Sequence, residues 1–364
     1  MPLRIGNYGA ALHPVFAFGA LTAVFPASRA TARAKFNTCV LAALAAFLFY
    51  GMYRFSRFFL AAWKDHDKRE TSLNLTNVVI LSSNFIAGLA IMYTCLLKAD
   101  RFDLILKNIQ RLSTFLNFDA SAGHANLRRR VWIRSVSAFV IMNFLFVYEP
   151  FVWPDYFHLL DLIGRLWSSV AIAILEMQVI CIADCLREIF CLLNARLVAT
   201  KMSIRTLRKS HGDLCDTLHL FQEHYGVFIV ANILYLFTSL TFGMYFSIVG
   251  IYQNLPDVEK IIKQAVVSDS WLCYAGYRLV QLVTLCSSSL KEARKTGIFI
   301  FRLNHPNIWQ IEKKELLIFS RQIQHQPHKF YATGILALDN SLLFETFSAV
   351  ATYFFIMVQF QNSL

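Results

Sequence analysis

Five polar side chains recur at helical spacing inside an apolar stretch near the carboxyl end of the sequence. The stretch runs from Leu336 to Phe360 and would span about 37 Å as a helix, enough to cross a bilayer. The polar residues follow at steps of four, three, four and seven, so they share one narrow helix face. They are Ser341, Glu345, Ser348, Thr352 and Gln359. A carboxylate facing lipid is costly, so this face needs water or protein in front of it.

Two arrangements satisfy that requirement. The stripe is either a polar seam packed against the chain's own helices, or a pore lining to which several subunits contribute the same stripe. In a pore, a ring of Glu345 carboxylates would favour cations over anions. The pore lining is the arrangement we favour.

The composition describes an all-α membrane protein that crosses the lipid bilayer several times. The chain has 364 residues, of which 56% are hydrophobic and 16% charged, with a mean hydropathy of +0.47. The net charge is +12, but the basic residues lie between apolar stretches, as membrane topology requires. We therefore expect no nucleic-acid partner.

Seven apolar stretches predict seven transmembrane helices within a single domain, residues 1–364. The stretches are residues 36–60, 77–97, 131–148, 159–182, 226–252, 266–287 and 336–360. The segment 183–225 keeps a helical hydrophobic period, so it is expected to extend span four outside the membrane. This extension and the connector 288–335 are predicted to pack as an anchor, with the segment Glu312–Phe330 as part of it.

The distribution of Lys and Arg predicts the orientation of these spans. The connectors 1–35, 98–130, 182–225 and 287–335 hold 25 of these residues, whereas the alternate loops hold 5. The bias places the amino terminus in the cytoplasm and the carboxyl terminus outside. A rhodopsin-like G-protein-coupled receptor has the opposite orientation, and its Asp-Arg-Tyr and Asn-Pro-x-x-Tyr signatures are missing here.

No pattern of a catalytic or metal site is present in the sequence. His219 and His224 are five residues apart, and His305, His325 and His328 lie in one connector, without the tight boxes that a di-iron enzyme needs. The eight cysteines have no zinc spacing. We expect no enzyme activity, catalytic residue, metal or cofactor, and we interpret the histidines as surface or packing residues.

Aromatic and charged residues gather at the outer halves of spans four and six. Asp161 and Arg165 are one turn apart on span four, a spacing suited to an intrahelical pair. The set is typical of a small-molecule pocket, but also of the aromatic belt at a membrane interface. The candidate ligand-binding residues are Trp153, Asp161, Arg165, Trp167, Trp271 and Tyr274.

The end of the last stretch carries a family resemblance. Thr352-Tyr353, five apolar residues and Gln359-Phe360 form a motif that resembles the terminal TY-(five hydrophobic)-QF signature of the insect gustatory receptor family. Seven residues upstream fit the terminal pattern of the same family: Phe319, Gln322, Phe330, Ala332, Gly334, Leu338 and Asp339. The remainder agrees in its hydropathy pattern, together with the segment His13–Arg29.

The resemblance implies a gustatory receptor in the plasma membrane of sensory neurons: a ligand-gated, non-selective cation channel opened by an extracellular small-molecule tastant. It implies a homo- or heterotetramer with other gustatory receptors, joined by an intracellular anchor, with the last helix of each subunit lining the pore. Gln359 and Phe360 would form the constriction, and Glu345, Ser348 and Thr352 the conduit. Phe354 follows the Thr-Tyr pair, where sugar-sensing members often carry an acidic residue.

Two alternatives remain open. An odorant receptor of related type would share the fold and the channel mechanism, but should lack the full terminal motif. A seven-span G-protein-coupled receptor would need the opposite orientation.

Overall fold

The computed structural model is described over residues 82–117, 122–152, 159–199, 203–253, 258–303, 310–325 and 330–362, with a few isolated positions before residue 82. The predicted first span, 36–60, and the connector 1–35 lie essentially outside the described residues. The elements are η1 (Tyr93–Leu97), α4 (Ala99–Phe115), α5 (Ala122–Val152), α6 (Leu159–Val198), α7 (Ile204–Gln253), α8 (Val258–Leu303), α9 (Gln310–Gln324), β1 (Tyr331–Ala332), β2 (Leu336–Ala337) and α10 (Asn340–Asn362).

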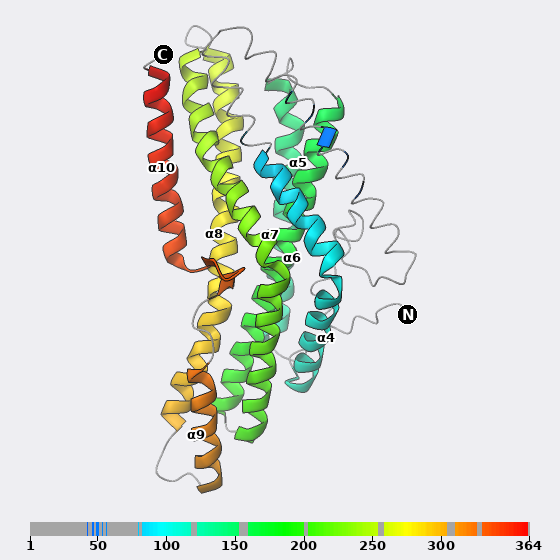
Figure 1. Cartoon of the computed structure of the whole chain (residues 1–364), viewed down its shortest axis with the longest axis vertical. Helices are drawn as coiled ribbons and strands as arrows, with labels where there is room; N and C mark the ends of the chain where they lie inside the picture. Colours follow the sequence, from blue (N-terminus) through cyan, green and yellow to red (C-terminus); the bar gives the residue numbers. More distant parts are fainter. Residues whose placement is uncertain are drawn as a thin grey trace.

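Three very long helices form the spine of the molecule. α6, α7 and α8 have 40, 50 and 46 residues, which corresponds to about 60–75 Å each, twice the thickness of a bilayer's hydrocarbon core. They pack against one another and run through both halves of the elongated molecule (Figure 1). The predicted extension of span four beyond residue 182 is helical as far as Val198, where α6 ends. Residues 204–225 of the predicted extension belong instead to α7, which begins at Ile204 and continues into span five.

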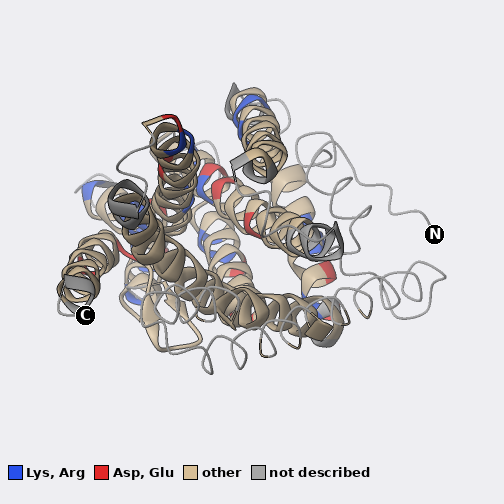
Figure 2. Cartoon of the chain, turned by 90° about the horizontal axis from the view of Figure 1, so that it is seen from above, with Lys and Arg blue, Asp and Glu red and all other residues tan. Residues whose placement is uncertain are grey.

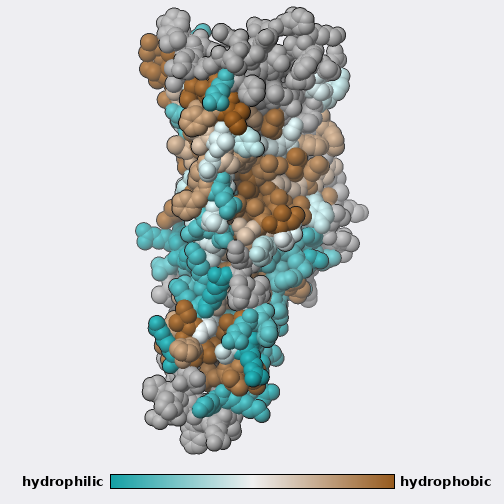
Figure 3. Space-filling view, turned by 60° about the vertical axis from the view of Figure 1, so that its left-hand side comes forward, coloured by the Kyte–Doolittle hydropathy of each residue, from teal (hydrophilic) through white to brown (hydrophobic). Residues whose placement is uncertain are grey.

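Several helices are long and apolar enough to cross a membrane. Among the described residues these are Ala125–Tyr148, Ser168–Val198, Ile204–Ile248 and Asn340–Gln359, and a pair bent by 67°, Ser82–Leu96 with Asp100–Phe115, gives up to a fifth. On the face shown in Figure 3, hydrophobic side chains form a broad area in the upper half, and hydrophilic ones prevail in the lower half. The chain is thus a helical membrane protein, while the seven-span count and the orientation stay predictions.

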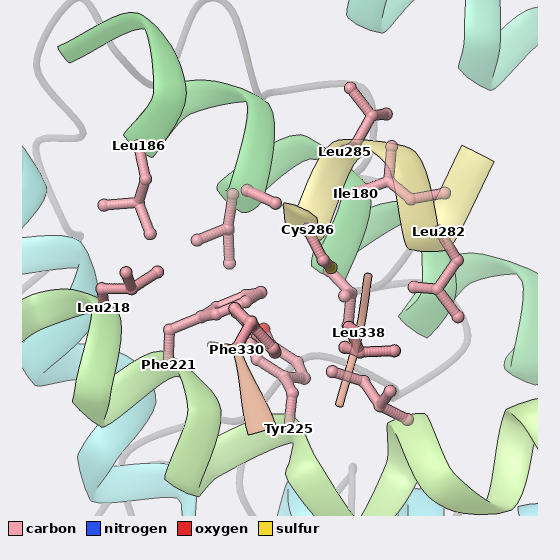
Figure 4. Packing of buried hydrophobic residues seen from close by; sticks show 14 of the residues in the cluster. Ile180, Leu186, Leu218, Phe221, Tyr225, Leu282, Leu285, Cys286, Phe330 and Leu338 are labelled. Atoms are coloured by element: carbon pink, nitrogen blue, oxygen red, sulfur yellow. The ribbon is translucent and has the colours of Figure 1, made fainter. Parts of the chain in front are cut away.

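A short hairpin follows α9, which lies in the lower half of the molecule in Figure 1, and leads into α10, which lies in the upper half. β1 and β2 pair antiparallel, and the turn between them contains Thr333 and Gly334, both with positive φ. On either side of the strands, Phe330 and Leu338 are buried, and the Leu338 N–H donates to the Phe330 carbonyl at 2.8 Å. Phe330 packs on Phe221 of α7, 5.7 Å between ring centroids, inside the main core (Figure 4).

The last helix begins later than the sequence predicts. Residues 336–337 belong to β2, and α10 starts at Asn340. The reason is a cap, because the Asp339 carboxylate accepts a hydrogen bond from the Ser341 backbone N–H at 3.1 Å. The transmembrane prediction survives this correction, because Asn340–Gln359 still has the length and hydropathy of a span.

Polar contacts hold the far ends of α6, α7, α8 and α9 together. The Asn194 amide donates to the Glu292 carbonyl at 3.0 Å and accepts from the Thr296 hydroxyl at 2.7 Å. Arg208 on α7 pairs with Glu315 on α9 at 3.2 Å. The predicted packing of the helical extensions with the segment Glu312–Phe330 is therefore present, whereas its cytoplasmic location remains a prediction.

Candidate functional site

One face of α10 packs on the bundle and the opposite face is open. Four residues at successive turns point at α7 and α8 and are buried: Leu342, Thr346, Val350 and Phe354. Tyr353 meets Phe237 of α7 edge to face, 5.9 Å between centroids. Seen from above, α10 stands at the edge of the bundle (Figure 2).

The polar stripe lies on the open face of α10. At about 100° per residue, it is roughly opposite the packed residues. All five of its members are exposed: Ser341, Glu345, Ser348, Thr352 and Gln359. The described helices of the same chain therefore do not bury this stripe, which excludes a polar seam between them. The side chain of Phe360 is outside the described part.

A charged triad lies deep between the three spine helices. Arg278 of α8 donates from Nη2 to Glu176 Oε2 of α6 at 2.6 Å, and from Nε to both Glu176 oxygens at 3.1 and 3.2 Å. Asn232 of α7 donates to Glu176 Oε2 at 2.6 Å and accepts from Arg278 Nη2 at 3.5 Å. The triad thus ties α6, α7 and α8 to one another.

The triad is almost completely enclosed. The side chains of Arg278 and Glu176 are 9% and 3% exposed, respectively. The guanidinium lies 5.9 Å from the ring centroid of Tyr235 and 5.5 Å from that of Tyr274, so it also makes cation–π contacts. Buried charges inside predicted membrane spans are costly and are retained where they pair or serve a function.

Sequence reasoning missed this triad. It selected Asp161 and Arg165 because they are one turn apart on a single helix. Glu176 and Arg278 are 102 residues apart, and only the packing of α6 against α8 brings them together. The available signal was an acid in the interior of one predicted span and a base in the interior of another.

Two of the predicted ligand-binding residues, Trp271 and Tyr274 of α8, lie close to the triad. They are 6.2 Å apart between ring centroids, and Trp271 meets Phe146 of α5 edge to face at 5.3 Å. Tyr274 is buried and Trp271 is half-buried. With Met142, Leu145 and Ala173 they form an apolar cluster separate from the main core.

The other predicted ligand residues are not tested by the structure. Trp153 lies outside the described residues. Asp161, Arg165 and Trp167 lie on α6, but their side chains fall outside the described part. The pairing of Asp161 with Arg165 therefore stays a prediction.

Polar groups also line the helix interfaces farther along the same half of the bundle. Ser83 shares a hydrogen bond with Thr238 of α7 at 2.8 Å, and Asn84 donates to Ser168 of α6 at 3.2 Å. The side-chain oxygen of Asn84, Oδ1, is buried and accepts no hydrogen bond from any described residue. Together with the aromatic cluster of Trp271 and Tyr274, these hydroxyl and amide groups give this half of the bundle the composition that suits a small neutral molecule.

The histidines tested by the structure have packing or surface positions. His224 is buried against Phe102 and Tyr225, and His219 lies on the surface, 3.5 Å from Glu223. Within the described ranges, no group of three His, Cys, Asp or Glu side chains is arranged to hold a metal ion.

Curated proteins similar to this chain are gustatory receptors of Drosophila melanogaster. The gustatory receptor for sugar taste 43a is 22% identical over 160 residues, covering 44% of this chain and 36% of the relative. The gustatory and pheromone receptor 32a is 35% identical over 98 residues, 26% of this chain and 20% of the relative. The gustatory receptor for bitter taste 66a is 22% identical over 168 residues, 46% and 32% of the two chains. The alignments thus span about a third or less of these relatives.

Solved structures with the same fold extend the match to nearly the whole chain. The insect olfactory receptor OR5 from Machilis hrabei has a TM-score of 0.74 at 9% identity, covering 97% of this chain and 98% of that one. Its complex with eugenol has a TM-score of 0.70 at 9% identity, covering 96% and 97%. The model of the 7tm chemosensory receptor family matches residues 12–363. The chain therefore belongs to the 7tm chemosensory receptor family, a family of receptors and not of enzymes.

Proposed function

We propose that this chain is a gustatory receptor subunit of a ligand-gated, non-selective cation channel, whose pore is lined by α10 from each subunit. The exposed polar stripe of α10 carries this proposal. Glu345 lies on the face that turns away from the bundle, within a helix that is apolar enough to span a membrane. Because a carboxylate facing lipid is costly, that face needs a water-filled conduit, which further copies of α10 would provide.

The roles proposed along α10 combine the chemistry of its polar stripe with the constriction that the resemblance to gustatory receptors implies. Glu345, Ser348 and Thr352 line the conduit, and the ring of carboxylates favours cations. Gln359 and Phe360 form the constriction near the carboxyl end of the helix. Phe360 resists wetting in the closed state, and Gln359 supplies a polar ring on opening.

The assembly that we propose is a homo- or heterotetramer with further copies of this chain or related receptors. Its anchor carries large apolar side chains that the described chain leaves uncovered. Phe301 is 82% exposed, and Ile298, Leu317 and Ile318 are exposed as well. They lie on the end of α8 and on α9, where Figure 3 shows hydrophobic patches among hydrophilic residues. The polar stripe already calls for further subunits, so a second copy is the occupant that we assign to this surface.

A small-molecule tastant is the stimulus that we propose. It enters from outside the cell and shifts a closed–open equilibrium by binding one state better than the other. The aromatic cluster of Trp271 and Tyr274 beside the charged triad supports a site within the bundle. The predicted orientation, with a cytoplasmic amino terminus and an extracellular carboxyl terminus in the plasma membrane of sensory neurons, completes the proposal.

An odorant receptor of the same channel type is the second candidate. The likeness to the olfactory receptor OR5 over nearly the whole chain favours it. The terminal motif Thr352-Tyr353 to Gln359-Phe360 and the gustatory relatives favour the first candidate. A G-protein-coupled receptor is the least favoured, because its orientation would oppose the charge distribution.

Expression of the full chain in a cell without other chemoreceptors tests this function. Sugars, alkaloids, polyphenols and odorants are applied while cation current is recorded, with G-protein signalling blocked. We expect a current that persists under the block and a lower cation-to-anion permeability ratio in Glu345→Gln. A response that vanishes with the block, or an unchanged ratio in open Glu345→Gln channels, would contradict the proposal.

A further inference from the structure

We infer that Arg278 binds the ligand directly, and that the ligand is a neutral molecule that presents an oxygen acceptor to the free Nη1 group of this arginine. The inference deepens the proposed function and rests on it, because it names the chemistry of the stimulus at the aromatic cluster. Arg278 contacts the ligand through Nη1, the nitrogen that its pairing with Glu176 leaves free.

The hydrogen-bond donors of Arg278 are only partly used. A guanidinium has five N–H donors in a fixed planar fork. Nε and Nη2 donate to Glu176 and Asn232, whereas no described residue accepts a hydrogen bond from Nη1. Nη1 is therefore the part of the 9%-exposed side chain that an oxygen can still reach, and a hydrogen bond to a charged donor in so enclosed a site is stronger than one in water.

The charge of the site selects against ions. Glu176 already compensates Arg278 at 2.6 Å, so the pair is neutral as a whole. A carboxylate ligand would have to compete with Glu176, and an ammonium ligand would meet the guanidinium. A hydroxyl, ether or carbonyl oxygen makes the bond without adding an uncompensated charge to the interior.

Aromatic rings complete the site around the guanidinium. Tyr235 and Tyr274 flank it at 5.9 and 5.5 Å, and Trp271 follows at 6.2 Å from Tyr274. The rings hold the plane of the guanidinium and offer apolar surface to the body of a ligand. The chemical class is therefore a small molecule with an apolar or aromatic body and one inward-facing oxygen.

Matched pairs of probes test this inference on the purified full-length protein in lipid nanodiscs. The pairs are eugenol with allylbenzene, benzyl alcohol with toluene, and cyclohexanone with methylenecyclohexane, each measured by quenching of tryptophan fluorescence against empty nanodiscs. For at least one pair, we expect the wild type to bind the oxygen-bearing member about tenfold or more tightly than its partner. Cation currents are recorded with the same probes.

Two variants remove the donor by different routes. Glu176→Met with Arg278→Met removes both charges together, so no lone charge stays buried. Arg278→Lys keeps a cation beside Glu176 but has no Nη1 branch to reach the ligand while the pair is made. In both variants, the two members of each probe pair should bind with affinities within about twofold of each other, because the hydrogen bond from Nη1 to the ligand oxygen is lost. Tyr277→Phe, on the exposed side of the same helix turn, is the control and should keep the wild-type preference.

The outcomes separate this inference from the channel proposal. A binding preference that the wild type shows and both variants lose, without any current, supports the role of Arg278 and contradicts the channel. Currents with a preference that survives in either folded variant overturn the role of Arg278 and leave the channel standing. The inference is also overturned if no oxygen-bearing probe binds the wild type, or if each pair binds equally well.

Discussion

Gly226 of α7 and Thr333 of the β1–β2 turn are in such close contact that a Cβ atom at residue 226 would lie 2.8 Å from the Thr333 nitrogen. The turn backbone therefore rests directly on α7. Because the same hairpin leads into α10, this contact fixes where the last helix leaves the core. It connects the anchor, the spine and the proposed pore helix at one point.

Gly226→Ala should therefore destabilise the protein. The added methyl group forces the turn away from α7, an overpacking effect of about 1–3 kcal/mol. Thermal unfolding in detergent, followed by size-exclusion chromatography, measures it. Gly243→Ala in the same helix is the control, because its Cβ would meet Leu272 only at ordinary contact distances of 3.5 Å and more. Equal melting temperatures for the two variants would contradict the contact.

Removal of one member of the buried ion pair should be worse than removal of both. Glu176→Met leaves the Arg278 guanidinium uncompensated, which costs about 3–5 kcal/mol, whereas the double change to Met is expected to be far milder. Melting temperatures of the two single variants and the double variant measure the coupling. If the losses in the single variants simply add in the double variant, the triad does not act as a unit.

A second buried carboxylate, Asp184, should be equally sensitive. It is fully buried on α6 and lies 2.8 to 3.2 Å from Arg130, Arg134 and Arg187. Asp184→Asn removes the buried charge that the three arginines share. Arg130 and Arg187 keep Glu188 at 2.6 Å, but Arg134 loses its carboxylate partner, so we expect a loss of several kcal/mol in stability. Glu259→Gln, which breaks only an exposed pair with Lys263, should change stability by less than about 1 kcal/mol. A small effect in Asp184→Asn would show that the arginines are hydrated instead.

The exposed apolar side chains of the anchor should control assembly. Phe301→Ser removes a side chain that is 82% exposed in the single chain, so it should lower the fraction of tetramer without unfolding the subunit. Light scattering after mild solubilisation measures the mass. Val258→Ser, at the other end of α8, is the matched control. An unchanged mass for Phe301→Ser would place the subunit interface elsewhere.

Part of the carboxyl-terminal region could be predicted from the sequence, since several of its motif residues have a local physical role. Phe330, Ala332 and Leu338 are buried, Gly334 has a φ of 74°, and Asp339 caps α10. The helical period likewise predicted that the stripe shares one face of α10. The start of the helix was misplaced because apolar residues before Asp339 continue the hydropathy pattern into β2.

The candidate ligand site was predictable only in part. Trp271 and Tyr274 could be found because aromatic residues cluster within one short segment of α8. Glu176, Asn232 and Arg278 come from three helices, and each alone has the appearance of an isolated polar residue in an apolar span. No short-range spacing relates them, so their meeting depends on the relative depth and rotation of α6, α7 and α8.

Thiol accessibility on α10 tests the pore-lining role most directly. Thr352→Cys places a thiol on the exposed stripe, and Val350→Cys places one on the face buried against the bundle. A charged methanethiosulfonate reagent is applied to open channels while current is recorded, with the wild type as the baseline for its native cysteines. We predict rapid, irreversible loss of current in Thr352→Cys and no change in Val350→Cys. Modification of neither position, or of Val350→Cys alone, would contradict a pore lined by this helix.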